Sequence, residues 1–98
     1  MPKPKTLEVV DDLAVVEIEF NGAVFTVPKD RDEWSVESEL AMFEARATGL
    51  SYWWAKWAEF GLGEAQWDKL INHTLTKRGD LVAFVKLFVK TVVAECGE

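Results

Sequence analysis

The dipeptide Asn21-Gly22, with the alternating sequence on both sides of it, constrains the fold more than any other feature of the chain. Asn-Gly is the preferred pair for a two-residue type I′ turn, in which both residues have a positive φ angle. Apolar residues alternate through residues 15–20 and again through residues 23–27, as in half-buried strands. The turn fixes a register in which six side chains share one face of a β-hairpin: Val16, Ile18, Phe20, Ala23, Phe25 and Val27.

Helices are predicted after Pro28, and they are needed because a two-stranded ribbon is not stable by itself. Acceptor and acidic side chains suited to a helix N-terminus come first: Asp30, Asp32, Glu33 and Ser35. Large apolar residues then recur four and three positions apart: Val36, Leu40, Phe43, Ala47, Leu50, Trp54 and Trp57. One helix over residues 35–60 would be about 40 Å long, too long for a domain with a radius of gyration of about 13 Å. We therefore expect a break at Gly49, with Ser51 as a new N-cap.

Two more helices are predicted toward the C-terminus. The sequence Gly61-Leu62-Gly63 ends the second helix, and the third runs from Glu64 to about His73. Its inward-facing residues are predicted to be Trp67, Leu70 and Ile71. After a loop over residues 76–79, Asp80 is expected to cap a helix over residues 81–95. This last segment is apolar nearly all round, which is typical of a helix buried on several sides. Its many valines leave a β-strand as an alternative interpretation.

The predicted fold class is α+β, mostly α, with an N-terminal β-hairpin followed by about four helices. Residues 13–96 are expected to form one domain, since a chain of 98 residues has little room for a second. Residues 1–12 are expected to be a flexible N-terminal segment, in which residues 7–10 could add a short edge strand.

Charge and composition exclude several classes of function. The net charge is −6, which argues against nucleic acid or an anionic membrane as the main ligand. The single Cys96 and single His73 suggest no disulfide, metal site or nucleophile–base pair, so we expect no enzyme and no cofactor. No signal peptide or membrane span is recognised, and the expected compartment is a reducing cytoplasm.

The aromatic residues carry the functional hypothesis. Five tryptophans and several phenylalanines could form the core of the domain or, in excess of what a core needs, a patch for a partner. The last helix has two apolar rows, one through Phe84 and Phe88 and one through Val85 and Val89, and so small a domain can hardly cover both. The residues predicted to bind the partner are Trp53, Trp54, Trp57, Phe84, Leu87 and Phe88.

From the hairpin onward, the order of short motifs resembles that of the tail assembly chaperones of long-tailed bacteriophages. In that family a β element of the form G-x-x-F/Y-T-V/L-P leads into D-x-D-x-W. Helical segments with a G-x-x-Q-W stretch follow, and a Thr/Asp-capped C-terminal helix rich in Leu, Val and Phe. The counterparts here are Gly22, Phe25-Thr26-Val27-Pro28, the acidic residues 30–34, Gly63-Glu64-Ala65-Gln66-Trp67 and Asp80-Leu81. The resemblance covers roughly residues 20–93, and the three tryptophans at 53–57 depart from the family pattern.

The resemblance implies a non-catalytic chaperone that binds apolar helical segments of the tape measure protein and keeps it soluble until the tail tube polymerises around it. It implies work in the host bacterial cytoplasm and absence from the mature virion. A homo-oligomer is expected, with no nucleic acid and no membrane as partner. The alternative hypothesis is a homo-oligomeric structural or connector component of a phage particle, in which the last helix is buried against copies of itself.

Overall fold

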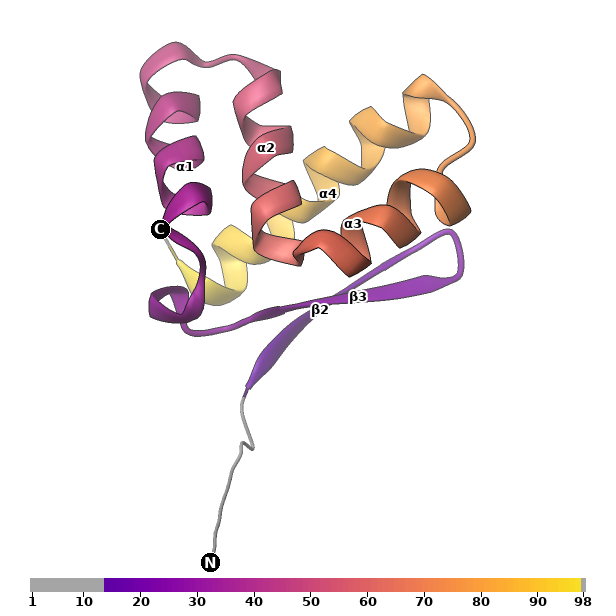
Figure 1. Ribbon diagram of the computed structural model, residues 1–98, viewed down its shortest axis with the longest axis horizontal. Coiled ribbons are helices and arrows are strands. Elements are labelled where there is room, and N and C mark those ends of the chain that lie inside the picture. The colour runs from indigo at the N-terminus through magenta and orange to yellow at the C-terminus, as the bar shows by residue number, and fades with distance from the viewer. Residues whose placement is uncertain (1–13, 98) are drawn as a thin grey trace, which may run out of the picture.

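The computed structural model describes residues 14–97, and Figure 1 shows how their elements are arranged. Within this range a two-stranded antiparallel hairpin precedes four α-helices, which confirms the predicted α+β, mostly α, fold class. The predicted flexible segment 1–12 and the edge strand at 7–10 lie outside the described residues. The elements are β2 (Val15–Phe20), β3 (Ala23–Pro28), the 3₁₀ turn η1 (Arg31–Glu33), α1 (Val36–Thr48), α2 (Ser51–Leu62), α3 (Glu64–Lys69), the π-helical turn η2 (Leu70–Thr74) and α4 (Arg78–Cys96).

The hairpin has the predicted turn and register. Asn21 and Gly22 have φ angles of 51° and 82°, as a type I′ turn requires. Val16 pairs with Val27 and Ile18 with Phe25, and these four side chains are all buried. Figure 1 shows the hairpin along one side of the helices, where β2 packs against α4 and β3 against α2. The hairpin thus supplies one wall of the core.

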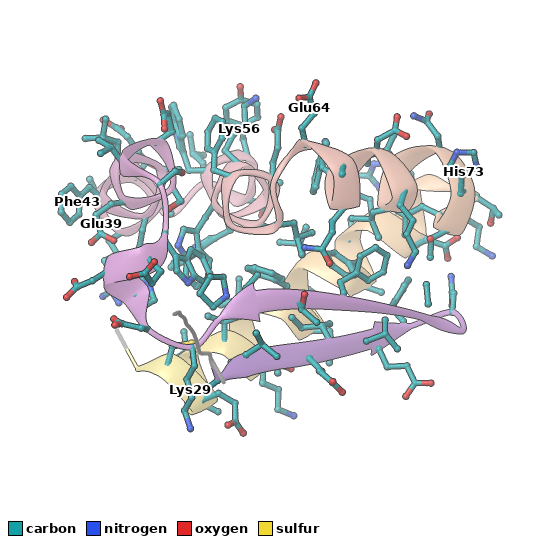
Figure 2. All side chains as sticks on the ribbon, turned by 60° about the horizontal axis from the view of Figure 1, so that its bottom comes forward. Lys29, Glu39, Phe43, Lys56, Glu64 and His73 are labelled. Atoms are coloured by element: carbon teal, nitrogen blue, oxygen red, sulfur yellow. The ribbon has the colours of Figure 1, made fainter. Side chains whose placement is uncertain are left out.

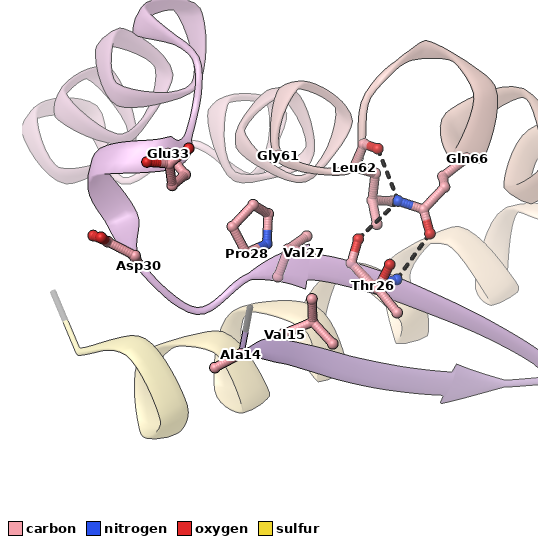
Figure 3. Close-up of a pocket in the computed structure, with 10 residues that line it drawn as sticks. All are labelled: Ala14, Val15, Thr26, Val27, Pro28, Asp30, Glu33, Gly61, Leu62 and Gln66. Carbon is pink, nitrogen blue, oxygen red and sulfur yellow. Dashed lines mark hydrogen bonds between the residues drawn. The ribbon is translucent and has the colours of Figure 1, made fainter. Parts of the chain in front are cut away.

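Side chains from outside the hairpin form hydrogen bonds with the edge of β3 that faces away from β2. The Gln66 amide accepts a hydrogen bond from the Thr26 backbone N–H (2.8 Å) and donates to the Thr26 carbonyl (2.7 Å), which Figure 3 marks with dashed lines. It also donates to the Leu62 carbonyl at the end of α2 (2.9 Å). The Trp34 indole N–H donates to the Pro28 carbonyl (2.8 Å). These bonds satisfy backbone groups that a two-stranded sheet would otherwise leave open.

The predicted break between the first two helices is confirmed. Gly49 has a φ angle of 72°, and its N–H donates to the Ala45 carbonyl, which ends α1 in a left-handed cap. Ser35 caps the start of α1 by accepting a hydrogen bond from the backbone N–H of Ser38 (3.2 Å). Ser51 was expected to be a new N-cap, but it is the first residue of α2, and the cap position belongs to Leu50 without a side-chain bond.

The last segment is a helix and not a strand, and it begins at Arg78, three residues earlier than predicted. Asp80 therefore lies inside the first turn instead of capping it. Its carboxylate reaches back to accept hydrogen bonds from the backbone N–H and the hydroxyl of Thr76 (2.9 and 2.8 Å). The carboxylate still ties the loop to the start of the helix, from a position within the helix itself.

These two bonds predict a pH dependence of stability. The Thr76 donors favour the charged form of Asp80 and lower the pKa of its carboxyl below the ordinary value. A lowered folded-state pKa contributes stability that is present above the unfolded-state pKa of about 3.9 and is lost as pH falls through the folded-state pKa. Urea unfolding of wild type and Asp80→Asn should therefore differ at pH 7 and converge in strong acid. Thr76→Ala keeps the backbone donor, so at pH 7 it should lose less stability relative to wild type than Asp80→Asn loses. Identical urea unfolding curves for all three proteins at pH 7 would contradict the prediction.

Helix α1 turns a face of small residues toward the protein. Its buried residues are Ser38, Ala41, Met42 and Ala45. The first part of the large apolar row predicted from the sequence faces solvent instead: Val36, Leu40 and Phe43 are exposed. Ile71, predicted to point inward, is also exposed, whereas its neighbour Leu70 is fully buried.

Trp57 lies at the centre of the core and has no exposed surface. The Trp34 ring stacks on it at 5.3 Å, and Phe88 meets it edge-on at 5.5 Å. The Arg31 guanidinium lies over both indoles, 4.9 Å from the Trp34 ring and 5.3 Å from the Trp57 ring. Arg31 also forms an ion pair with Glu39 (2.9 Å), so a cation closes the core at its α1 side. No pattern in the sequence predicts this role for Arg31.

Candidate partner-binding surface

The structure divides the six residues predicted to bind a partner into two groups. Trp57, Phe84 and Phe88 are fully buried and belong to the core, so their prediction as surface contacts is corrected. They are buried because they face the hairpin and one another: Phe84 contacts Phe25 edge-on at 5.6 Å and Phe20 at 5.5 Å. Partly exposed side chains that pack at the edge of the core make up the second group: Trp53, Trp54 and Leu87.

One exposed apolar area lies on α1. We call it the α1 row, and it consists of Val36, Leu40 and Phe43, which are 72%, 56% and 57% exposed. Figure 2 shows Phe43 on the outer side of α1, away from α2. At 100° per residue the three apolar side chains fall on one face of the helix, with Glu37 and Glu44 along one flank and Glu39 on the other. The α1 row is therefore an exposed apolar strip with carboxylates beside it, and its three side chains also line a hollow of about 490 Å³ next to η1.

A second apolar area is a groove between α2 and α4, which we call the α2–α4 groove. Three adjoining hollows of about 280, 280 and 430 Å³ form it, and neighbouring hollows share lining residues. Its floor is the row of valines at positions 82, 85, 89 and 93 on α4, and its wall on α2 includes Tyr52, Trp54 and Ala55. The lining on α4 runs from Leu81 to Ala94, which is about 20 Å at 1.5 Å per residue.

The charged side chains that line the α2–α4 groove are all basic. Lys86 and Lys90 project from α4, and Arg46 comes from the end of α1. Lys86 and Lys90 are exposed, and within residues 14–97 neither forms an ion pair. The chain as a whole has a net charge of −6, so this is a local reversal of sign on an acidic protein. A partner with carboxylates beside an apolar face would fit it.

The sequence pointed to α4 but to the wrong one of its two rows. The row through Phe84 and Phe88 is buried, whereas the second row is covered only in part: Val85 is buried, Val89 is partly exposed and Val82 is 41% exposed. The larger aromatic side chains were chosen as contacts, although their size favours the core. The α1 row was recognised as a helical stripe, but no sequence signal showed that it faces solvent.

A further hollow of about 390 Å³ lies between the start of the hairpin and the end of α2, as Figure 3 shows. Two of the polar side chains around it, Gln66 and Asp30, are held in structural hydrogen bonds. Gln66 is bonded to Thr26 and Leu62, and the Asp30 carboxylate accepts from the backbone N–H of Asp32 (2.9 Å). This hollow is therefore not our candidate site.

The two residues that could supply nucleophile or base chemistry do not define a site. Cys96 is half-buried near the Pro28 carbonyl, and burial raises the pKa of its thiol, which disfavours the reactive thiolate. His73 is exposed on the last turn of η2. Among residues 14–97 no group of three His, Cys, Asp or Glu side chains could hold a metal ion. None of the helices described is long and apolar enough to cross a membrane.

A scan against protein-family models, a search of curated proteins and a search of solved structures give no significant match.

Proposed function

We propose that this protein is a non-catalytic chaperone that binds an apolar helical segment of another protein, and that it acts in phage tail assembly with the tape measure protein as its client. The observation that carries the proposal is the α2–α4 groove, an apolar channel about 20 Å long beside a core that is already complete. Helix-in-groove binding uses such a surface, with apolar side chains of the client at helical spacing. The phage assignment follows from the motif resemblance alone.

The physical demands on such a chaperone agree with the rest of the molecule. An aggregation-prone helix stays dispersed when its apolar face is covered and the outside of the complex carries net charge. The groove would cover the client helix, and the net charge of −6 would keep the complex soluble. We further propose that the protein works in the host bacterial cytoplasm and is absent from the mature virion.

Co-expression with the tape measure protein tests the proposal. Wild type should raise the soluble fraction of the client severalfold, whereas Tyr52→Glu with Val82→Glu, which places two carboxylates in the groove, should abolish the gain. The matched control is Val15→Glu with Val24→Glu, a similar change on the exposed face of the hairpin, which should act like wild type. Circular dichroism checks that both variants fold.

Three results would count against this proposal. If wild type fails to raise client solubility, the protein is not a chaperone for this client. If the groove variant works as well as the hairpin variant, the α2–α4 groove is not the client site. Recovery of the protein from purified mature particles would favour a structural component of the virion instead.

A further inference from the structure

We propose that in the free protein the α2–α4 groove of one copy is occupied by the α1 row of a second copy. The inference concerns the chain by itself and stands whether or not the client is a phage protein. It starts from the two exposed apolar areas of the molecule. The α1 row lies on the outer side of one helix, and the α2–α4 groove lies between two others.

The α1 row is short enough to lie within the groove. From Val36 to Phe43 it covers about 10 Å along α1. The groove lining from Leu81 to Ala94 covers about 20 Å along α4. The row can therefore lie along the groove, with its three side chains against the α4 valines. These three side chains are more than half exposed in the single copy, so docking would remove a large apolar area from water.

The two areas also carry opposite charge. Glu37 and Glu44 are exposed along one flank of the α1 row, and Lys86 and Lys90 are exposed along the groove, where they have no ion-pair partner within residues 14–97. Complementary charge of this kind sets which partner binds and in which orientation. Pairing groove with groove or row with row would bring like charges together, because the first places lysine near lysine and the second places glutamate near glutamate.

The interface therefore pairs the row of one copy with the groove of another. Two copies can exchange rows about a two-fold axis to form a closed dimer, or each row can enter the groove of the next copy in a ring or an open chain. A client helix that enters the groove must displace the α1 row, which would couple client binding to disassembly.

Charge reversal on each side tests this arrangement by sedimentation velocity over a range of concentrations up to about 1 mM, where weak associations are populated. Wild type should form species larger than a monomer, and raising the salt concentration should weaken them. Lys86→Glu with Lys90→Glu, and separately Glu37→Lys with Glu44→Lys, should each weaken self-association at least about tenfold. An equimolar mixture of the two variants should assemble again, because acidic groove then meets basic row and basic groove meets acidic row.

The matched control is Lys29→Glu with Lys69→Glu, which changes the net charge equally at exposed positions outside the groove and should assemble like wild type. A monomeric wild type, or variants that assemble unchanged or fail to assemble when mixed, would overturn the inference. If wild type is monomeric but still solubilises the client, only this inference fails. If the copies associate as described but no client is solubilised, the proposed function fails and the inference stands.

Discussion

Replacing Trp57 with alanine is expected to lower the free energy of unfolding by about 3–5 kcal/mol, the usual cost of removing a large aromatic side chain from a core. Trp57 is fully buried and contacts Trp34, Trp54 and Phe88, so no small shift of one neighbour can fill the space. Small domains are stable by about 0.05–0.15 kcal/mol per residue, so this loss would remove much of the total. Urea denaturation followed by circular dichroism measures it.

Two further variants separate core from surface in the same experiment. Trp57→Phe keeps an aromatic ring and should cost clearly less, since it also removes an indole N–H that has no partner within the described residues. Phe43→Ala, on the α1 row, should change the free energy of unfolding by no more than about 0.5 kcal/mol. A fully folded Trp57→Ala protein with wild-type stability would mean that this ring is not in the core.

Replacing Gly61 with alanine is expected to destabilise the protein by about 1–3 kcal/mol, although alanine is the better helix former. A Cβ atom at Gly61 would lie 2.5 Å from Cζ3 of Trp34, closer than such atoms can approach. The Trp34 ring would have to move, which disturbs its stacking on Trp57 and its hydrogen bond to the Pro28 carbonyl. A lower melting temperature and a lower midpoint in urea should both follow.

Gly79→Ala is the matched control for this effect. Gly79 also lies in a helix, but no heavy atom is within 4 Å of the Cβ position and its φ angle is not positive. Alanine there should leave stability unchanged or raise it by up to about 1 kcal/mol. If both alanine variants moved the urea midpoint in the same direction, contact with Trp34 would not be the reason that position 61 holds glycine.

Features set by local chemistry could be predicted from the sequence. The Asn21-Gly22 turn, the register that pairs Ile18 with Phe25, and the end of α1 at Gly49 each depend on conformations that few residues adopt. The start of α4 was placed three residues late because Asp80 resembles an N-cap in sequence. An aspartate that bonds Thr76 from inside the first turn of the helix has the same local sequence as an N-cap aspartate.

The candidate site was less predictable because it depends on which residues the core does not use. The sequence contained both the apolar surplus and the helical rows that hold it, so the existence of an uncovered surface could be inferred from the residues alone. It could not show that α1 packs through Ser38, Ala41 and Ala45 and leaves Phe43 outside. Small side chains give a weak hydrophobic signal, yet they permit the closest approach of two helices.

The amino-acid sequence by itself determined the hairpin, the number and type of the helices, and the fact that apolar residues exceed what so small a core can hold. Tertiary structure decided which of those residues are left over, since that depends on how the helices pack against one another and against the hairpin. Packing buried Trp57, Phe84 and Phe88 and left open the α1 row and the α2–α4 groove, with Lys86 and Lys90 beside it. Local preferences act over a few residues, whereas burial depends on contacts between segments far apart in the chain.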